Sequence, residues 1–112
     1  MKIEKIRKHC EWIIDHFKEI NYFDEFTNNE ELVYSSAFVL SQIGELAKRL
    51  DQEKKKIYQN VPWHNIVGLR NRIIHDYSGI DLEIIYDICT NDIPELLENL
   101  KDTKVAKASK WM

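Results

Sequence analysis

Apolar residues recur at steps of three and four along the first part of the chain. Ile3, Ile6, Cys10, Ile13 and Phe17 fall on one stripe, and Ile20 continues it. Charged residues occupy most of the remaining positions. This spacing is typical of an amphipathic helix that buries one face. We expect this helix to end near Asn21.

A second amphipathic stretch follows residues 27–30. Thr27 and Glu30 have the spacing of a capping box, in which a hydroxyl and a carboxylate satisfy the first free N–H groups of a helix. An apolar stripe then runs to Leu50, and the small residues Ser36 and Gly44 allow another helix to approach closely. The charged residues 51–56 are interpreted as a solvated turn.

Two more helices are predicted in the C-terminal half. Pro62 suits a helix start, and we expect a helix from about His64 to Tyr77 that ends at Ser78-Gly79. A fourth begins near Asp81, and Pro94 should kink or split it near Thr90-Asn91. The pattern thus predicts an all-α protein, an antiparallel four- to five-helix bundle over residues 1–102, with a basic and frayed tail at residues 103–112.

Composition narrows the class of protein further. The chain has 112 residues, enough for one domain, and only 3 Gly and 2 Pro, which favours long helices over many turns. The net charge of −3 gives no overall attraction for nucleic acid, so any contact with RNA must be a local basic patch. Two cysteines are too few for a disulfide framework or a four-cysteine zinc site. No signal peptide or membrane span is evident, and we expect a cytoplasmic protein with no membrane partner.

The third helix carries one residue out of pattern. At about 100° per residue, Arg70 falls within the apolar arc, where a guanidinium is costly unless an anion meets it. Arg70 could extend its charge to solvent, form a structural ion pair with Glu45, or bind a substrate anion. Asn71 and His75 lie at the edge of the arc, and His75 alone could be a half-buried imidazole bonded to a carbonyl. Tyr77 alone would be a core residue with its hydroxyl at the edge of the core.

Residues Arg70 to Tyr77, read together, resemble a known motif. Arg, a polar residue, His five positions after the Arg, and Tyr two positions later are similar to the motif of HEPN domains, and most closely to that of HepT-like toxins. Gly44-Glu45, Pro62-Trp63 and the segment from Asp92 to Leu96 resemble other parts of the same branch. The similarity covers roughly residues 3–100.

The resemblance implies a HEPN-type bundle that is homodimeric and acts as the toxin of a toxin-antitoxin system. Its activity would be that of a metal-independent endoribonuclease, with Arg70 and His75 catalytic and Asn71 supporting them, and with no cofactor. The partner would be a minimal nucleotidyltransferase antitoxin that silences the toxin by AMPylation of Tyr77. Glu45, Arg72 and His64 are further candidates to support the site.

The residues fit this chemistry on independent grounds. Cleavage of RNA by its own 2′-hydroxyl requires proton transfer, for which His is suited at neutral pH, and stabilisation of a charged phosphorane, for which Arg supplies donors. The sequence contains no metal-ligand motif such as HExxH. Arg70 and His75 point about 140° apart around one helix, so a site shared by two subunits is favoured.

Two other functions remain open at this point. A HEPN module could bind a nucleotidyltransferase or a nucleotide without cutting RNA, because fold alone does not decide function. A helical bundle could also pair with another protein through its apolar stripes alone. The combination of Arg70, His75 and Tyr77 favours the nuclease.

Overall fold

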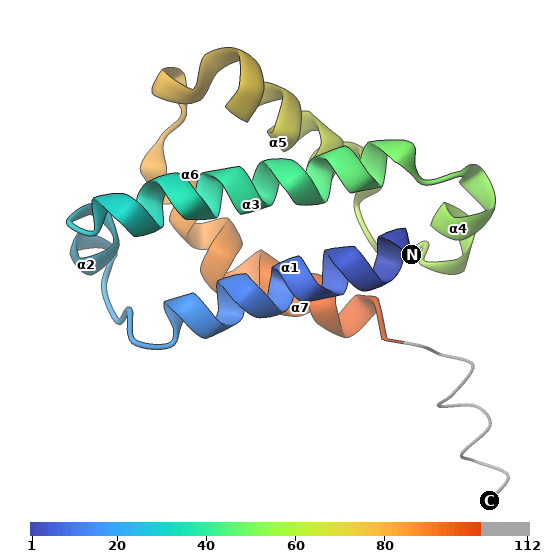
Figure 1. The fold of residues 1–112 in the computed structure, drawn as a ribbon, viewed down its shortest axis with the longest axis horizontal. Helices are drawn as coiled ribbons and strands as arrows, with labels where there is room; N and C mark the ends of the chain where they lie inside the picture. The colour runs from blue at the N-terminus through green and yellow to red at the C-terminus, as the bar shows by residue number, and fades with distance from the viewer. Residues whose placement is uncertain (102–112) are drawn as a thin grey trace, which may run out of the picture.

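The computed structural model describes residues 1–101, and within that range the chain is helical with no strand (Figure 1). The helices, in chain order, are α1 (Lys2–Phe17), α2 (Phe23–Thr27), α3 (Glu30–Arg49), α4 (Gln52–Ile57), α5 (Trp63–Asp76), η1 (Tyr77–Gly79), α6 (Leu82–Asp87), η2 (Ile88–Asp92) and α7 (Ile93–Asn99). The all-α prediction is therefore confirmed. The tail predicted at residues 103–112 lies outside the described residues.

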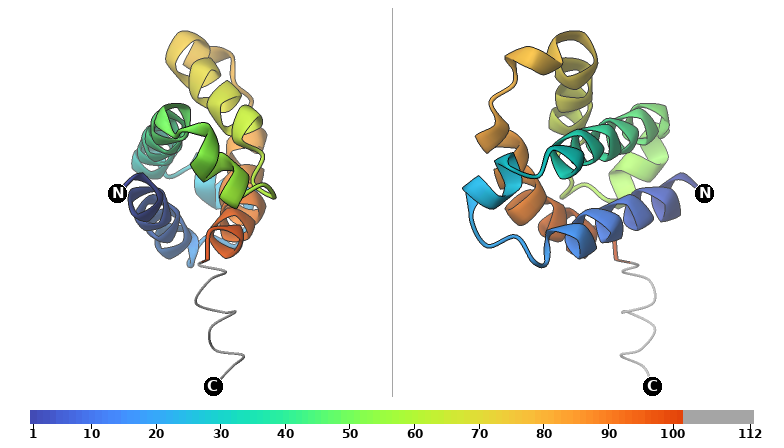
Figure 2. Two further views of the ribbon diagram at one scale, coloured as in Figure 1. Left: turned by 90° about the vertical axis from the view of Figure 1, so that its right-hand side faces the viewer. Right: turned by 60° about the vertical axis from the view of Figure 1, so that its left-hand side comes forward.

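Helix α3 is the central element of the bundle. It packs against α5 on one side and α1 on the other, while α7 packs against α1 (Figures 1 and 2). Tyr34 near the start of α3 lies beside Tyr77 after the end of α5, and Gly44 lies beside Arg70 farther back along α5. Helices α3 and α5 are therefore antiparallel, as predicted.

The core lies between α1, α3 and the segment from α6 to α7. The apolar stripe of α1 is buried there, and Ile6, Cys10 and Ile13 are wholly inaccessible to solvent. Cys89 of η2 reaches the same core, and burial raises the pKa of both thiols to about 12, with Glu11 adding to the shift at Cys10. Both cysteines are thus protonated packing residues at neutral pH, as the apolar stripes predict.

The capping box predicted at Thr27 is wrong. Thr27 ends the short helix α2, where its hydroxyl donates to the carbonyl of Asp24, and the cap of α3 is Asn29, whose side chain accepts from the N–H of Leu32 at 3.1 Å. The cause is Phe26, which is fully buried with its ring centroid 5.5 Å from that of Phe17. Burial of one aromatic ring stabilises a separate turn of helix before α3 can begin.

Two other boundaries differ from the prediction. Helix α1 ends at Phe17, before the expected stop at Asn21. Residues 52–57 form α4 in place of a turn, because Asp51 caps this helix by accepting from the N–H of Lys54 at 2.9 Å. A short cap motif within a run of charges was enough to start a helix where no apolar stripe exists.

The predicted break in the last helix is confirmed. Asp81 caps α6 by accepting from the N–H of Glu83, and the helix widens into a π-turn at η2, just before Pro94. Proline lacks the N–H that a regular helix requires, and a π-turn accommodates that gap. Across the described residues, no helix combines the length and the apolar character that crossing a membrane requires.

Candidate functional site

The contact between α3 and α5 depends on Gly44. A Cβ at this position would overlap with the Cβ of Arg70 and would lie 2.9 Å from its Cγ and 3.1 Å from the carbonyl oxygen of Ile66. Only a residue without a side chain lets the two backbones come this close. The next residue along α3, Glu45, is thereby placed within reach of the Arg70 guanidinium.

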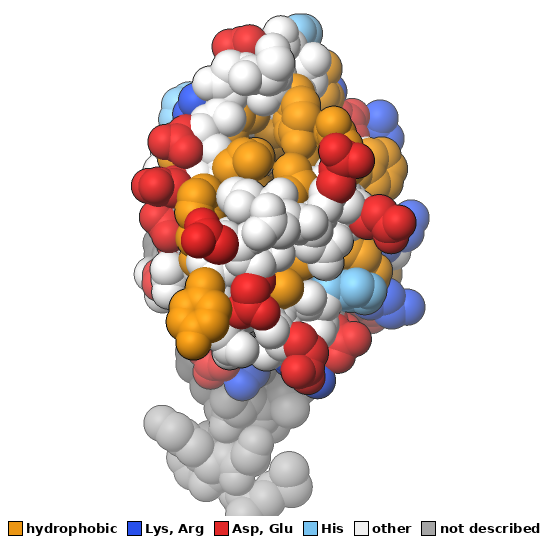
Figure 3. Space-filling view, turned by 90° about the vertical axis from the view of Figure 1, so that its left-hand side faces the viewer, with side chains coloured by type: hydrophobic (Ala, Val, Ile, Leu, Met, Phe, Trp, Pro, Cys, Tyr) orange, Lys and Arg blue, Asp and Glu red, His pale blue; other side chains and the backbone are white. Residues whose placement is uncertain are grey.

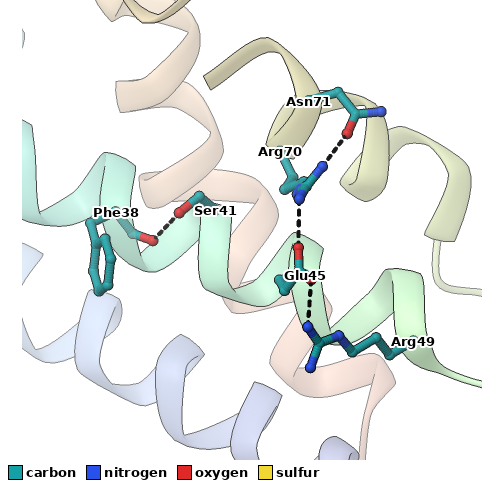
Figure 4. A network of polar contacts seen from close by, with 6 residues as sticks. All are labelled: Phe38, Ser41, Glu45, Arg49, Arg70 and Asn71. Atoms are coloured by element: carbon teal, nitrogen blue, oxygen red, sulfur yellow. Dashed lines mark hydrogen bonds and ion pairs between the residues drawn. The ribbon is translucent and has the colours of Figure 1, made fainter. Parts of the chain in front are cut away.

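Arg70 is the centre of a polar network between the two helices (Figure 4). Its Nη2 lies 2.7 Å from Oε2 of Glu45, and its Nη1 donates to Oδ1 of Asn71 at 2.8 Å. The other oxygen of Glu45 lies 3.0 Å from Nη2 of Arg49, one turn farther along α3. One carboxylate therefore holds two guanidinium groups.

The network sets the charge of its carboxylate. Partial burial by itself would raise the pKa of Glu45, but the charge and hydrogen bond of Arg70, helped by Arg49 and Lys48, outweigh burial and lower it. Glu45 is thus ionised at neutral pH. The Nε of Arg70 is buried and has no hydrogen-bond partner among the described residues.

The structure decides between the alternatives for Arg70. Its side chain is only 17% exposed, which contradicts the interpretation that the charge extends to solvent. The ion pair with Glu45 is confirmed, and it accounts for the position of Arg70 without a substrate. The same contacts fix the direction of the guanidinium, which is the condition for precise recognition of a phosphate.

His75 lies apart from this network. Its side chain is exposed, and among the described residues no hydrogen bond to its imidazole is found, so the half-buried, carbonyl-bonded interpretation is wrong. His64 is also exposed, at the first turn of α5, and Arg72 is exposed on the opposite face. The structure therefore brings together Arg70, Asn71 and Glu45, but not His75, His64 or Arg72.

Tyr77 lies at the end of α5, where the helix tightens into η1. It is half-buried, and its ring centroid lies 5.9 Å from that of Tyr34 on α3. Burial, with a smaller contribution from the Tyr34 hydroxyl, raises the pKa of Tyr77 above its ordinary value. Tyr77 is thus a neutral phenol at the edge of the same α3–α5 surface.

Three large apolar side chains of α3 and α5 lie exposed. Tyr34 is 59% exposed, Phe38 62% and Ile74 52%. We call these three residues the apolar rim. Tyr34 and Phe38 were not among the residues predicted from the sequence, although aromatic residues on the polar side of the α3 stripe were a signal for an exposed contact surface.

An apolar cavity lies elsewhere. A cavity of about 240 Å³ opens between α3, α5 and α7, and its lining includes Leu40, Leu69 and Leu96 but none of the candidate site residues. In the part of the chain that the structure describes, no group of three or more His, Cys, Asp or Glu residues is arranged to hold a metal ion. The candidate site is accordingly the α3–α5 surface around Arg70.

Comparison with known proteins agrees with the motif. A family model described as "Ribonuclease HepT-like" matches residues 6–103. A relative from Caldanaerobacter subterraneus, named "Putative RNase", is 34% identical over 89% of this chain and 88% of its own length. A protein of the same description from Methanocaldococcus jannaschii is 35% identical over 80% of this chain and 81% of its own.

A third relative carries the family name itself. The "Probable ribonuclease HepT" of Thermococcus cleftensis is 28% identical over 84% of each chain. No solved structure showed a significant match to the chain.

Proposed function

Because the chain belongs to the HepT-like ribonuclease family, we propose that it is a metal-independent endoribonuclease acting as the cytoplasmic toxin of a toxin-antitoxin pair. The observation that carries the proposal is the state of Arg70, whose guanidinium is oriented by Glu45 and Asn71, while His75 is exposed elsewhere on the same helix. An oriented arginine and an accessible imidazole are the two groups that RNA cleavage without a metal requires.

In the proposed reaction the RNA supplies its own nucleophile. The 2′-oxygen forms a bond to the adjacent phosphorus as the bond from phosphorus to the 5′-oxygen breaks, leaving a 2′,3′-cyclic phosphate and a 5′-hydroxyl. His75 accepts the proton of the 2′-hydroxyl, and a second acid protonates the 5′-oxygen. Arg70 donates to the phosphoryl oxygens, whose negative charge increases in the transition state.

Two copies of the chain form the active species in this proposal. Arg70 and His75 point about 140° apart around α5, so one phosphate is not reached easily by both from one chain. A twofold arrangement brings Arg70 of each subunit towards His75 of the other, so that one arginine and one histidine from different chains meet at each phosphate. The apolar rim supports this arrangement, since three large exposed apolar residues on α3 and α5 favour a covered surface.

Tyr77 is the proposed point of control by a nucleotidyltransferase antitoxin. It follows Arg70 by seven residues, directly after the end of α5, and its ring lies beside Tyr34 of the neighbouring helix α3. An AMP unit transferred from ATP to the Tyr77 hydroxyl, with release of pyrophosphate, adds a bulky phosphodiester anion close to Arg70. That anion would compete with the substrate phosphate for the guanidinium and obstruct the surface.

The first experiment is cleavage of end-labelled RNA in excess EDTA by protein whose Tyr77 is shown by intact mass to be unmodified. We expect fragments that end in a 2′,3′-cyclic phosphate. His75→Ala should remove the activity, whereas His16→Ala, which changes an exposed histidine of α1, should retain it. Absence of cleavage by the unmodified protein would contradict the nuclease and favour a non-catalytic module that binds the nucleotidyltransferase or a nucleotide.

The shared site has a separate test. Arg70→Ala and His75→Ala proteins, each inactive alone, are mixed and allowed to exchange subunits. One of the two sites in a mixed dimer then has both wild-type groups, so cleavage should partly return. Failure of the mixture to cleave, with subunit exchange verified by mass, would contradict a site built from two chains.

A further inference from the structure

The net charge of −3 conceals a strong separation of charge along α3. Residues 48–56, where α3 ends and α4 begins, hold five Lys or Arg residues and two acidic ones. We call this group the basic edge; its cations are Lys48, Arg49, Lys54, Lys55 and Lys56. Among the described residues, the lysines of the basic edge form no ion pair, and Lys48, Lys54 and Lys56 are exposed.

The other end of α3 is acidic. Residues 19–31 and 76–87 together hold nine acidic residues and no Lys or Arg, and all nine carboxylates are exposed. The two segments meet because α2 packs against α6. Figure 3 shows this face, with carboxylates spread across it and Lys or Arg confined to its margin.

The two ends are far enough apart to act independently. Helix α3 has 20 residues, so its ends are separated by roughly 30 Å. Charges on the surface are screened over about 8 Å at physiological ionic strength. A polyanion close to the protein therefore encounters attraction at one end and repulsion at the other, whatever the net charge.

The candidate site lies next to the attractive end. Arg49 is one turn from Glu45, and the two are joined by the 3.0 Å ion pair that continues to Arg70. Four residues of an α-helix advance roughly 6 Å along its axis. Helix α4 and the start of α5 lie at this same end of the molecule (Figure 2, left), so the basic edge borders the path to Arg70.

We infer that the basic edge binds the phosphate backbone of the RNA substrate, so that the strand crosses the α4 end of each subunit. The inference rests on the proposed ribonuclease function. Lysine ammonium groups are point charges that neutralise phosphates without reading the bases. The basic edge is therefore expected to raise the affinity for RNA and to set the direction of the strand, without a preference for sequence.

The test measures RNA binding at several salt concentrations in a cleavage-inactive His75→Ala protein. Labelled single-stranded RNA is titrated, and the affinity is followed against salt. Neutralising two basic-edge lysines, Lys54→Gln with Lys56→Gln, should lower the slope of log affinity against log salt by about 0.7 for each phosphate that the protein no longer neutralises. The control is Lys8→Gln with Lys18→Gln, which removes the same charge from two exposed lysines, one in α1 and one directly after its end, where Lys18 pairs with Asp15.

The control should keep the slope of the parent. Equal slopes for all three proteins, or equal reductions in the two double variants, would overturn the inference. A basic-edge variant that binds RNA normally but no longer binds a purified nucleotidyltransferase would also overturn it, by making the surface a protein contact.

A cleavage assay separates this inference from the proposed function. In the active protein, the basic-edge variant should raise KM severalfold with kcat retained. Cleavage with the same KM and kcat in the basic-edge variant and the parent would refute the inference but not the proposed nuclease. Salt-dependent binding through the basic edge without any cleavage refutes the nuclease and leaves the binding surface in place.

Discussion

The two sides of α3 are packed in different ways. Towards α1 the contacts are apolar, and Ile6, Cys10 and Ile13 of α1 are wholly inaccessible to solvent. Towards α5, apolar contacts are joined by a glycine at the closest approach, by the Arg70–Glu45 ion pair and by exposed apolar residues. The comparison indicates that the contacts on the α1 side contribute most to stability. The α5 side also holds a largely buried ion pair and exposed apolar residues, which are typical of a functional surface.

The largest difference should appear in activity. His75→Ala on the α5 side removes an exposed imidazole, so we expect RNA cleavage to fall by about 10²–10⁴-fold. The free energy of unfolding should change by less than about 0.5 kcal/mol, because the imidazole is not packed in the core. Cleavage rates and urea unfolding on the same preparation check both values. A large decrease in stability would show that His75 is structural.

A substitution on the α1 side should have the reverse effect. Ile13→Ala opens a cavity at a fully buried position and should lower the free energy of unfolding by about 2–5 kcal/mol. Ile74→Ala, at a half-exposed position of the apolar rim, should change it by less than about 0.5 kcal/mol in the monomer. Urea unfolding of the two variants at the same concentration compares them. Equal decreases would remove the distinction between the two sides.

Two glycines test the close approach of the helices. Gly44→Ala places a methyl group against Arg70 and should cost about 1–3 kcal/mol of stability, with reduced cleavage because the guanidinium is displaced. Gly68→Ala, in α5, meets nothing within 4 Å and should increase stability by about 0.5–1 kcal/mol through helix propensity. Thermal unfolding of both variants should therefore move in opposite directions. Shifts of the same sign would contradict the close contact at Gly44.

The smallest expected effect is in the pH dependence. The pKa of Glu45 is lowered in the folded protein, so its pairing with Arg70 stabilises the fold above the pKa of the unfolded chain, near 4.5. That contribution disappears as the pH falls through the lower folded value, because the folded state then has to take up the proton. Urea unfolding from pH 7 to pH 3 should show a shallower decline for Glu45→Gln than for the wild type. Parallel curves would show that the ion pair adds nothing to stability.

Several features of the fold could be predicted from local sequence. The stripe of α1, the start of α6 at Asp81 and the break before Pro94 follow from periodicity, a capping side chain and a missing N–H, each of which acts within a few residues. Helices α2 and α4 were missed for the opposite reason. Phe26 holds α2 through distant rings, and the single cap at Asp51 starts α4 without an apolar stripe.

The residues of the candidate site also fall into those that local sequence could identify and those that depend on contacts between helices. The motif from Arg70 to Tyr77 is continuous in sequence, so the residues that belong to it and the helix that carries them could be identified directly. Glu45 could be named only as one possible partner, because a pair separated by 25 residues depends on how α3 and α5 cross. Tyr34 beside Tyr77 gave no local signal of that contact.

The sequence by itself determined the family, the helical class and the residues of the motif, because periodicity and motif spacing are properties of neighbouring residues. Only the tertiary structure decided that Arg70 is held by Glu45, that His75 is exposed, and that the lysines of α4 lie at one end of the molecule with the carboxylates of α2 and α6 at the other. Those results depend on the antiparallel contact of α3 with α5 at Gly44 and on the packing of α2 against α6, which join residues far apart along the chain.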